Sequence, residues 1–159
     1  MKNLGSHGLV QKGSDNDESI RISLIMAGPG MAAQARVKDS VASLVDLMPT
    51  LLGAAGQAMP THCQGSSLSG EGGGAAPSNR TAFVETVRSA GLRSANMTYV
   101  LKRDGDGRLS KQPIVAYDNS YDPFQYNNVA GTRTCPELDA KLRAFDKAYP
   151  WSRLEDEVQ

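Results

Sequence analysis

LGSHGLVQKG occupies residues 4–13, and DESIRISLIMAGPG occupies residues 17–30. The first stretch is a polar, glycine-rich loop, and it leads into an apolar run from Ile20 to Met26. Such a run predicts a strand buried on both faces, which is typical of a sheet covered by helices. Ligands usually bind in loops at the ends of such strands, and a lysine there can meet an anion as a point charge. Lys12 is therefore the first candidate site residue.

A short helix is expected downstream, behind a second apolar stretch. Residues 41–45 favour another strand, and Asp46 can then cap a helix over residues 47–55 that ends at Gly56. Pro49 fits the first turn of that helix, where backbone N–H groups have no intrahelical partner. With the preceding strand, these elements predict a piece of an α/β sheet.

The pattern changes after residues 65–80, which are rich in glycine and serine and favour a flexible surface loop. Short strands are expected at 81–87, 97–103 and 114–117, with an Asp-Gly hairpin turn at 104–107. This succession predicts a small antiparallel sheet.

A helix is expected to follow the sheet. It begins at Cys135-Pro136, because proline suits the first helical position, and Pro150 ends it. One face of this helix is apolar and carries Leu138, Leu142, Phe145 and Tyr149. We therefore expect three parts: residues 1–64 as an α/β piece, 65–80 as a loop, and 81–159 as an α+β unit.

Composition and charge exclude several function classes. The 159 residues carry seventeen basic and seventeen acidic side chains, and 40% of them are hydrophobic. Because the charges cancel and no stripe of Lys and Arg stands out, neither nucleic acid nor a membrane surface is expected as a partner. The longest apolar run is too short to span a bilayer, and no signal peptide is recognisable, so the compartment stays open.

The two cysteines, Cys63 and Cys135, lie far apart in the sequence. Either one disulfide or two free thiols fits this spacing, and free thiols are the favoured interpretation. No CxxC pair or histidine cluster occurs, so no metal site is expected in this chain.

Four stretches stand in an order that is found in one enzyme family. The family's patterns are LG-x-HG-x-x-x-K-G with Y-[DE]-E-S-[IL]-R-[IV]-P-L-I and x-GPG, then SLVDLAPTLL, G-R-S-L and LYDLENDPYExNNLA. Their counterparts here are residues 4–30, residues 43–52 (SLVDLMPTLL), residues 65–68 (GSSL) and residues 117–130 (YDNSYDPFQYNNVA). In this order they resemble the C-terminal part of the sulfatases of the alkaline-phosphatase superfamily. The resemblance implies a remnant of the alkaline-phosphatase-like α/β/α sheet, followed by a small antiparallel sheet with a C-terminal helix.

The resemblance also implies a reaction for the whole enzyme. A formylglycine, made from the Cys or Ser of a C/S-x-P-x-R motif, attacks the sulfur of a sulfate ester, and a divalent cation, usually calcium, polarises the sulfate. Lysines and histidines neutralise charge and assist the leaving group, because negative charge at the sulfuryl oxygens must be held by cations placed in advance. The implied partner is a sulfate-ester small molecule or glycan.

The resemblance assigns two site residues in this chain. Lys12 matches the lysine that contacts the sulfate and stabilises its charge. His7 lies in the same loop, and we expect it to shape the loop from behind the site rather than to donate a proton. Glu18 and Arg21 are interpreted as a structural ion pair or as surface charges. No cofactor-binding or metal-ligating residue is expected here.

The chain also departs from the family pattern, and these departures affect what activity can be expected of it. No C/S-x-P-x-R motif occurs, no paired Asp-Asp opens a first strand, and the metal-binding D-[HN]-G would lie just before the first match. Asn16, Ser23 and Ser66 stand where Tyr, Pro and Arg are usual. We therefore expect a C-terminal fragment of a sulfuric ester hydrolase that is inactive alone, needs no cofactor of its own and can self-associate through residues 20–52.

Two alternatives stay open. One is a fragment of a related phosphonate monoester hydrolase or phosphodiesterase, which shares the same loop and strand pattern. The other is a non-catalytic structural or binding remnant.

Overall fold

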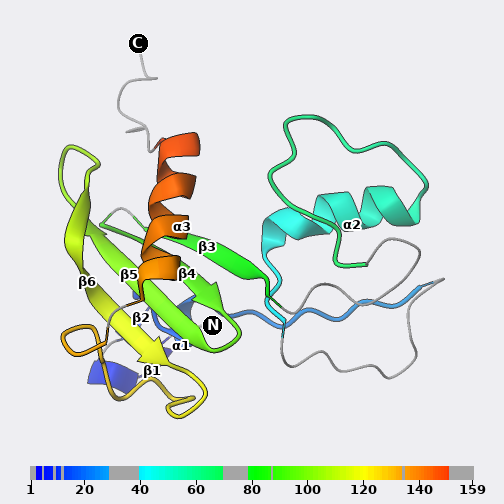
Figure 1. The fold of residues 1–159 in the computed structure, drawn as a ribbon. Coiled ribbons are helices and arrows are strands. Elements are labelled where there is room, and N and C mark those ends of the chain that lie inside the picture. Colours follow the sequence, from blue (N-terminus) through cyan, green and yellow to red (C-terminus); the bar gives the residue numbers. More distant parts are fainter. Residues whose placement is uncertain are drawn as a thin grey trace.

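The structure, a computed structural model, describes residues 3–4, 6–8, 10–11, 13–28, 40–69, 79–86, 88–133 and 135–150. Its centre is an antiparallel four-stranded sheet in the order β3-β4-β5-β6 (Figure 1). The strands are β3 (Thr81–Thr86), β4 (Ser89–Ser94), β5 (Met97–Arg103) and β6 (Leu109–Asp118). Each strand pairs with the next along the chain, so the sheet is a simple meander.

Helix α3 (Pro136–Ala148) covers one face of this sheet. Leu142 is fully buried and packs with Leu92, Tyr99 and Leu101 in the core. The rings of Phe83 and Phe145 stack with their centroids 4.0 Å apart, which fixes the helix over β3. The expected start at proline is confirmed, and so is the apolar face at Leu138, Leu142 and Phe145. Tyr149, which was also expected on this face, lies just beyond the end of the helix and is 47% exposed.

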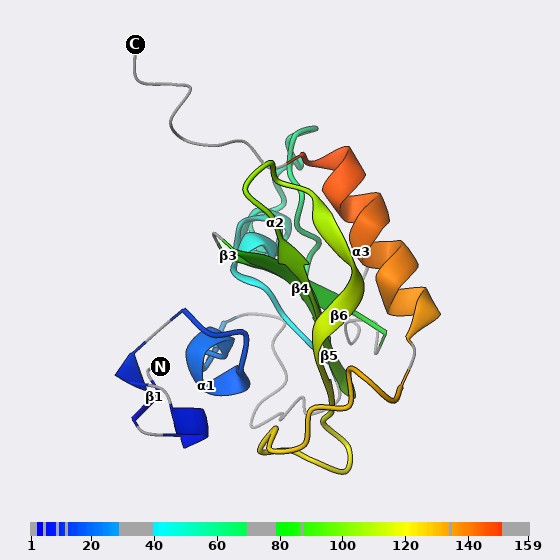
Figure 2. The same ribbon diagram turned by 90° about the vertical axis from the view of Figure 1, so that its left-hand side faces the viewer.

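The opposite face of the sheet is covered by residues 13–20, which include helix α1 (Asp17–Ile20). Figure 2 shows the layers in order, with α1 and α3 on opposite sides of the sheet. Alternation along β5 explains this arrangement, because Tyr99 and Leu101 pack with the α3 layer while Thr98 and Val100 line the pocket beside α1. The sheet therefore joins an early and a late segment of the chain.

The turn at 104–107 joins β5 to β6 as predicted. Gly107 has φ +82°, which explains the glycine there. The Asp104 carboxylate accepts hydrogen bonds from the backbone N–H groups of Asp106 and Arg108, at 2.9 and 2.8 Å. The acidic residues of this turn thus stabilise the hairpin itself.

A third group of elements lies beyond β3. A 3-10 turn (Leu44–Asp46) runs directly into helix α2 (Leu47–Ala54), which confirms the expected helix, and Gly56 follows it at φ +65°. Asp46 does not cap α2 as expected, because its side chain closes the capping box of the 3-10 turn instead. The side chain of Asp46 accepts hydrogen bonds from the backbone N–H groups of Ser43 and Ser66. Its carboxylate also pairs with Arg80 at 2.7 Å. Asp46 therefore ties the start of α2 to residues on both of its flanks.

Two strand predictions were wrong, and one strand was missed. Residues 21–27 have no regular secondary structure, and residues 41–43 lead into the 3-10 turn instead of forming a strand. An apolar run becomes a strand only when a neighbour supplies backbone partners, and no described strand pairs with residues 20–26. The missed strand is β4, whose pairing with β3 and β5 outweighs its weak strand propensity.

The other predictions concern cysteines, membranes and domains. Cys63 and Cys135 are both free thiols, as favoured. Within the described ranges, no helix is long and apolar enough to cross a membrane. The division at residues 65–80 stays a prediction, and residues 70–78 of that stretch lie outside the described residues.

Candidate functional site

The loop that carries the candidate site residues is closed by a short strand pair. Strand β1 (Asn3–Leu4) lies antiparallel to β2 (Val10–Gln11), with Asn3 opposite Gln11. A 3-10 turn at residues 6–8 lies between them, and there His7 has φ +55° and Gly8 has φ +68°. Two consecutive residues in the left-handed region make the tight reversal possible.

Lys12, the predicted sulfate-contacting residue, lies outside the described residues, but both of its neighbours are described. Gln11 ends β2, and Gly13 has φ +108°, a conformation that favours glycine. The backbone N–H of Gly13 donates a hydrogen bond to Oγ of Ser19, at 3.2 Å. The backbone next to Lys12 is therefore anchored to helix α1.

His7 lies against the same helix. Its Nε2 atom is 3.6 Å from a carboxylate oxygen of Glu18, and its ring centroid lies 5.6 Å from that of Tyr126. Glu18 therefore faces His7, while Arg21 lies 3.9 Å from Asp17. Of the two interpretations offered for Glu18 and Arg21, the ion pair between them is not formed, and both side chains are partly or largely exposed, at 41% and 73%. His7 contacts α1 and the 121–126 loop at once, and its role in shaping the site stays a prediction.

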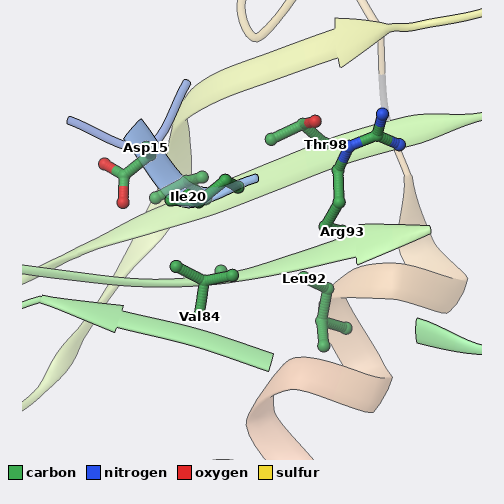
Figure 3. A pocket seen from close by; sticks show the side chains of 8 residues that line it. Asp15, Ile20, Val84, Leu92, Arg93 and Thr98 are labelled. Carbon is green, nitrogen blue, oxygen red and sulfur yellow. The ribbon is translucent and has the colours of Figure 1, made fainter. Parts of the chain in front are cut away.

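Two acidic side chains fasten the α1 segment to the sheet. Asp17 accepts two hydrogen bonds from the guanidinium of Arg93, at 2.7 and 2.8 Å. Asp15 accepts a hydrogen bond from Oγ of Ser89, at 2.9 Å. Figure 3 shows Asp15, Ile20 and Arg93 around the small pocket between this segment and the strands. A bidentate arginine–carboxylate pair is a strong and directional contact.

The electrostatics of these two acids differ. Burial raises the pKa of the Asp15 carboxyl, and the hydrogen bond from Ser89 only partly offsets it. A raised folded-state pKa means that Asp15 favours folding at pH values below its unfolded pKa. That contribution is lost as the pH rises through the folded value. The Asp15 carboxyl therefore contributes less to folding stability at neutral pH than in acid.

Gln125 joins the late sequence box to α1. It is 2% exposed and has φ +58°, which is rare for a residue with a side chain. Its Oε1 accepts a hydrogen bond from the backbone N–H of Asp17 at 2.8 Å, and its Nε2 donates to Oγ1 of Thr98 at 3.0 Å. The side-chain amide of Gln125, which lies 108 residues from Asp17 in sequence, thus bridges the first turn of α1 and strand β5.

We predict that Gln125→Ala loosens α1 from the sheet. Leaving a buried donor or acceptor unpaired costs about 1–3 kcal/mol, so local opening becomes about 10- to 100-fold more frequent. Hydrogen exchange should accelerate at the amides of Ser19, Ile20 and Arg21, which are bonded within this turn.

Two further variants separate the amide from the backbone. Gln125→Gly relieves the positive φ but still lacks the amide, so it should show the same acceleration. Gln112→Ala removes an exposed glutamine from β6 and should have no effect. Normal exchange in Gln125→Gly would assign the effect to backbone strain rather than to the amide.

Comparisons with known proteins match this arrangement. A model of the family "N-sulphoglucosamine sulphohydrolase, C-terminal" matches residues 5–85, from the candidate loop through α2 to β3. This chain belongs to the sulfatase family. It corresponds to the C-terminal portion of a sulfatase, as the sequence predicted.

Individual sulfatases show the same relationship. Arylsulfatase K of Mus musculus is 33% identical over 87% of this chain, which covers 27% of that protein. The ulvan-active sulfatase of Formosa agariphila is 31% identical over 79% of this chain, covering 26% of its length. The chain therefore spans about a quarter of these curated relatives.

A solved structure supports the fold. A protein in complex with its substrate, D-glucosamine-2-N,6-O-disulfate, superimposes with a TM-score of 0.72 and 25% identity. The match covers 98% of this chain and 33% of that one. The predicted fold class, an α/β sulfatase remnant with an antiparallel sheet and a C-terminal helix, is confirmed.

Sulfatases are expected to use a divalent cation, which carboxylate oxygens usually bind. Across the described ranges, no group of three or more His, Cys, Asp and Glu side chains is placed to hold a metal ion. The nearby acids, Asp15, Asp17 and Glu18, face Ser89, Arg93 and His7 respectively. These three residues do not fit a calcium site.

Sequence reasoning missed the residues that hold the site loop in place. Asp15, Asp17, Arg93 and Gln125 lie in three segments whose contacts cross 74 to 108 positions of sequence. Residues 17–30 and 117–130 both belong to the family pattern, and this shared membership was the one available sign that these two segments could be in contact.

Proposed function

We propose that this chain is the C-terminal part of a sulfuric ester hydrolase in which Lys12 contacts the sulfate group of the substrate. The observation that carries the proposal is the family match over residues 5–85, which includes the loop around Lys12. The anchoring of Gly13 to Ser19 supports it, because a charge-stabilising lysine requires a backbone held in place before the reaction.

The role of Lys12 is electrostatic. Negative charge grows on the sulfuryl and leaving-group oxygens as the sulfur–oxygen bond breaks, and a fixed ammonium group lowers the energy of that state. The nucleophile, a formylglycine, and the residues that hold the calcium ion belong to a part of the enzyme that this chain does not contain. No C/S-x-P-x-R motif occurs among its residues.

The substrate class we propose is a sulfated small molecule or glycan. One structural neighbour is bound to a disulfated glucosamine, and one relative is named for its action on ulvan. These facts concern those proteins, and they support a sulfated carbohydrate as the first substrate to test.

We predict that the purified chain alone does not hydrolyse 4-nitrocatechol sulfate, with or without added calcium. Lys12 can stabilise charge, but it cannot attack sulfur. Release of 4-nitrocatechol at the rate of the buffer blank is the expected result, with an intact arylsulfatase as the positive control. Turnover that Lys12→Ala abolishes would contradict the proposal.

The coding DNA upstream of Met1 separates the remaining alternatives. An in-frame C/S-x-P-x-R motif followed by D-[HN]-G would support the sulfatase. A stop codon immediately upstream would support a non-catalytic remnant. If the longer protein exists, comparing its rates on a sulfate ester and on a phosphonate monoester distinguishes the two hydrolase classes.

A further inference from the structure

A surface cavity of about 270 Å³ lies between β6 and the start of α3. Three segments line it: residues 111–113 of β6, the loop at 130–133 and the first turn of α3, with Tyr99 of β5 behind them. Figure 2 shows β1 and α1 on the other side of the sheet, so the cavity is separate from the candidate loop. Its volume is close to the lower end of the roughly 300–1,000 Å³ range of small-molecule pockets, which suits one ring rather than a single ion.

The loop that forms one wall is fixed to β6 before any ligand binds. The backbone N–H of Val129 donates to the carbonyl of Ala116 at 2.9 Å, and Oδ1 of Asn128 accepts from the N–H of Ala116 at 3.0 Å. At the other end of the loop, Arg133 pairs with Asp118. A cavity with preformed walls loses little conformational entropy when a ligand enters.

The charges that line the cavity, taken with their partners, leave one positive charge in excess. Hydrogen bonds from Arg143 lower the pKa of the Asp139 carboxyl, so this acid is ionised and balanced by Arg143. The hydrogen bond from Arg133 likewise lowers the pKa of Asp118. Lys111 is exposed and has no ion-pair partner within the part of the chain that the structure describes. Its ammonium group is therefore available to an anionic ligand.

The cavity also offers acceptors for hydroxyl groups. An ionised carboxylate has about four acceptor sites. Asp139 uses three of them, for the hydroxyl of Tyr99 at 2.8 Å and for two N–H groups of Arg143 at 2.8 and 3.1 Å. The hydroxyl of Thr132 donates to the carbonyl of Val129, which leaves its oxygen free to accept. A ligand hydroxyl can therefore donate to either residue.

Two proline rings, Pro113 and Pro136, add apolar surface on opposite walls. An inorganic anion would leave this surface and the acceptors unused. A purely apolar ring would leave Lys111 and Asp139 without contacts. A sugar ring with one anionic substituent uses all three features, because it has an apolar C–H face, hydroxyl donors and a negative charge.

We propose that this cavity binds one sulfated sugar unit, with the sulfate group at Lys111 and Arg133. The ring lies between Pro113 and Pro136, and one of its hydroxyls donates to Asp139. The choice of sulfate among anionic groups rests on the proposed function. The residues that line the cavity lie outside the stretch that the family model matches, residues 5–85, so this is a second site on the chain for the same class of carbohydrate.

Cys135 reports whether the cavity is occupied, because its thiol lines it. Burial raises the pKa of this thiol, and the nearby charge of Arg133 offsets the rise only in part. The full chain is treated with iodoacetamide, a neutral reagent, at constant ionic strength, and peptide mass spectrometry measures the alkylation rates of Cys135 and Cys63 separately. Glucose 6-sulfate should slow Cys135 saturably, by at least about fivefold, since only the empty cavity reacts. Cys63, which does not line the cavity, should react at an unchanged rate.

A matched pair of lysine variants tests the position of the sulfate. Lys111→Gln removes the charge and should weaken the apparent affinity for glucose 6-sulfate by about tenfold, because a charge-assisted contact is lost. Lys102→Gln removes an exposed lysine from β5, outside the cavity, and should leave the affinity unchanged. Both variants should melt within about 2 °C of the unmodified chain, because both side chains are exposed.

Every other result overturns the proposal. Equal protection by glucose would show that the charge is not read, and equal protection by sodium sulfate would show that the ring is not. Absence of protection would exclude the site, and full protection of Lys111→Gln would place the sulfate elsewhere.

One further variant keeps this test separate from the proposed function. A chain with Lys12→Ala should be protected as well as the unmodified chain, whereas lost protection would place the sugar at the candidate loop. Because the readout is protection of a thiol, failure of the longer protein to hydrolyse sulfate esters would contradict the proposed function and leave this result unchanged.

Discussion

Lys12→Ala in the whole enzyme is expected to lower kcat/KM for a sulfate ester by about two to four orders of magnitude. Removing one preorganised donor from a transition state loses several kcal/mol, because the developing oxyanion charge then lacks a counter-charge. Both kcat and kcat/KM should fall, since the contact strengthens as charge grows. Steady-state kinetics on 4-nitrocatechol sulfate would measure this, in the longer protein or in an arylsulfatase K that carries this chain as its C-terminal part.

Matched variants distinguish a substrate contact from a general loss of positive charge. Lys102→Ala removes an exposed lysine on β5 and should leave the kinetics unchanged. Added calcium should not restore activity to Lys12→Ala, because the lost contact is to the substrate rather than to the metal. A decrease smaller than about threefold would mean that Lys12 is only a solvated loop residue.

Ser19→Ala tests the anchoring of the same loop. It removes the acceptor for the N–H of Gly13 without touching Lys12, so we expect a smaller loss that appears mainly in kcat. Comparing the two variants separates the effect of Lys12, which is proposed to contact the substrate, from that of Ser19, which positions the loop that carries Lys12.

The elements that sequence patterns predicted correctly carry their own local signals. Strand β5 is rich in residues that favour strands, its hairpin turn contains two Asp-Gly steps, and α3 begins at proline with an apolar stripe. Each of these signals acts within a few residues, so no knowledge of distant partners is needed. The family pattern extended this local information to the fold class.

The wrong and missed strand predictions arise where distant residues, rather than the local sequence, decide the structure. Strand β4 contains Gly91, and a Cβ there would lie 2.9 Å from the carbonyl oxygen of Tyr99, so close packing between strands requires the glycine that weakens the strand signal. The apolar run at 20–26 predicted a covered strand, yet those residues have no strand partner among the described segments. Both cases depend on neighbours that local sequence does not specify.

The candidate site was predictable only in part for the same reason. The loop and its glycines follow from sequence, but the polar contacts that hold it reach Arg93 and Gln125 in distant segments. Opposite-charge and amide contacts over such separations leave no periodic signal. The family pattern placed Lys12 in the loop without indicating what anchors it.

The largest expected effect on stability is at Arg103. Its guanidinium is 1% exposed and lies 2.6 Å from Glu85 on β3 and 2.7 Å from Asp146 on α3. It also donates to the carbonyl of Gly107, at 2.6 Å. Arg103→Met keeps most of the volume but leaves two carboxylates without a cation, and breaking a buried pair in this way costs about 3–5 kcal/mol. Both acids keep some contact with solvent, so we expect the lower end, about 3 kcal/mol, or a melting temperature lower by about 6–12 °C.

A triple variant tests whether the loss comes from the stranded acids. Adding Glu85→Gln and Asp146→Asn to Arg103→Met removes both charges, so the penalty should shrink to well under half of the single-variant value.

Arg108→Met is the surface control, because Arg108 and its partner Asp106 are 77% and 71% exposed, and such a pair contributes at most about 1 kcal/mol. Urea denaturation of the four proteins would measure these differences. If Arg103→Met were no more destabilising than Arg108→Met, the contact between β5, β3 and α3 would not depend on this guanidinium. If the triple variant were as unstable as the single one, lost packing rather than uncompensated charge would be the cause.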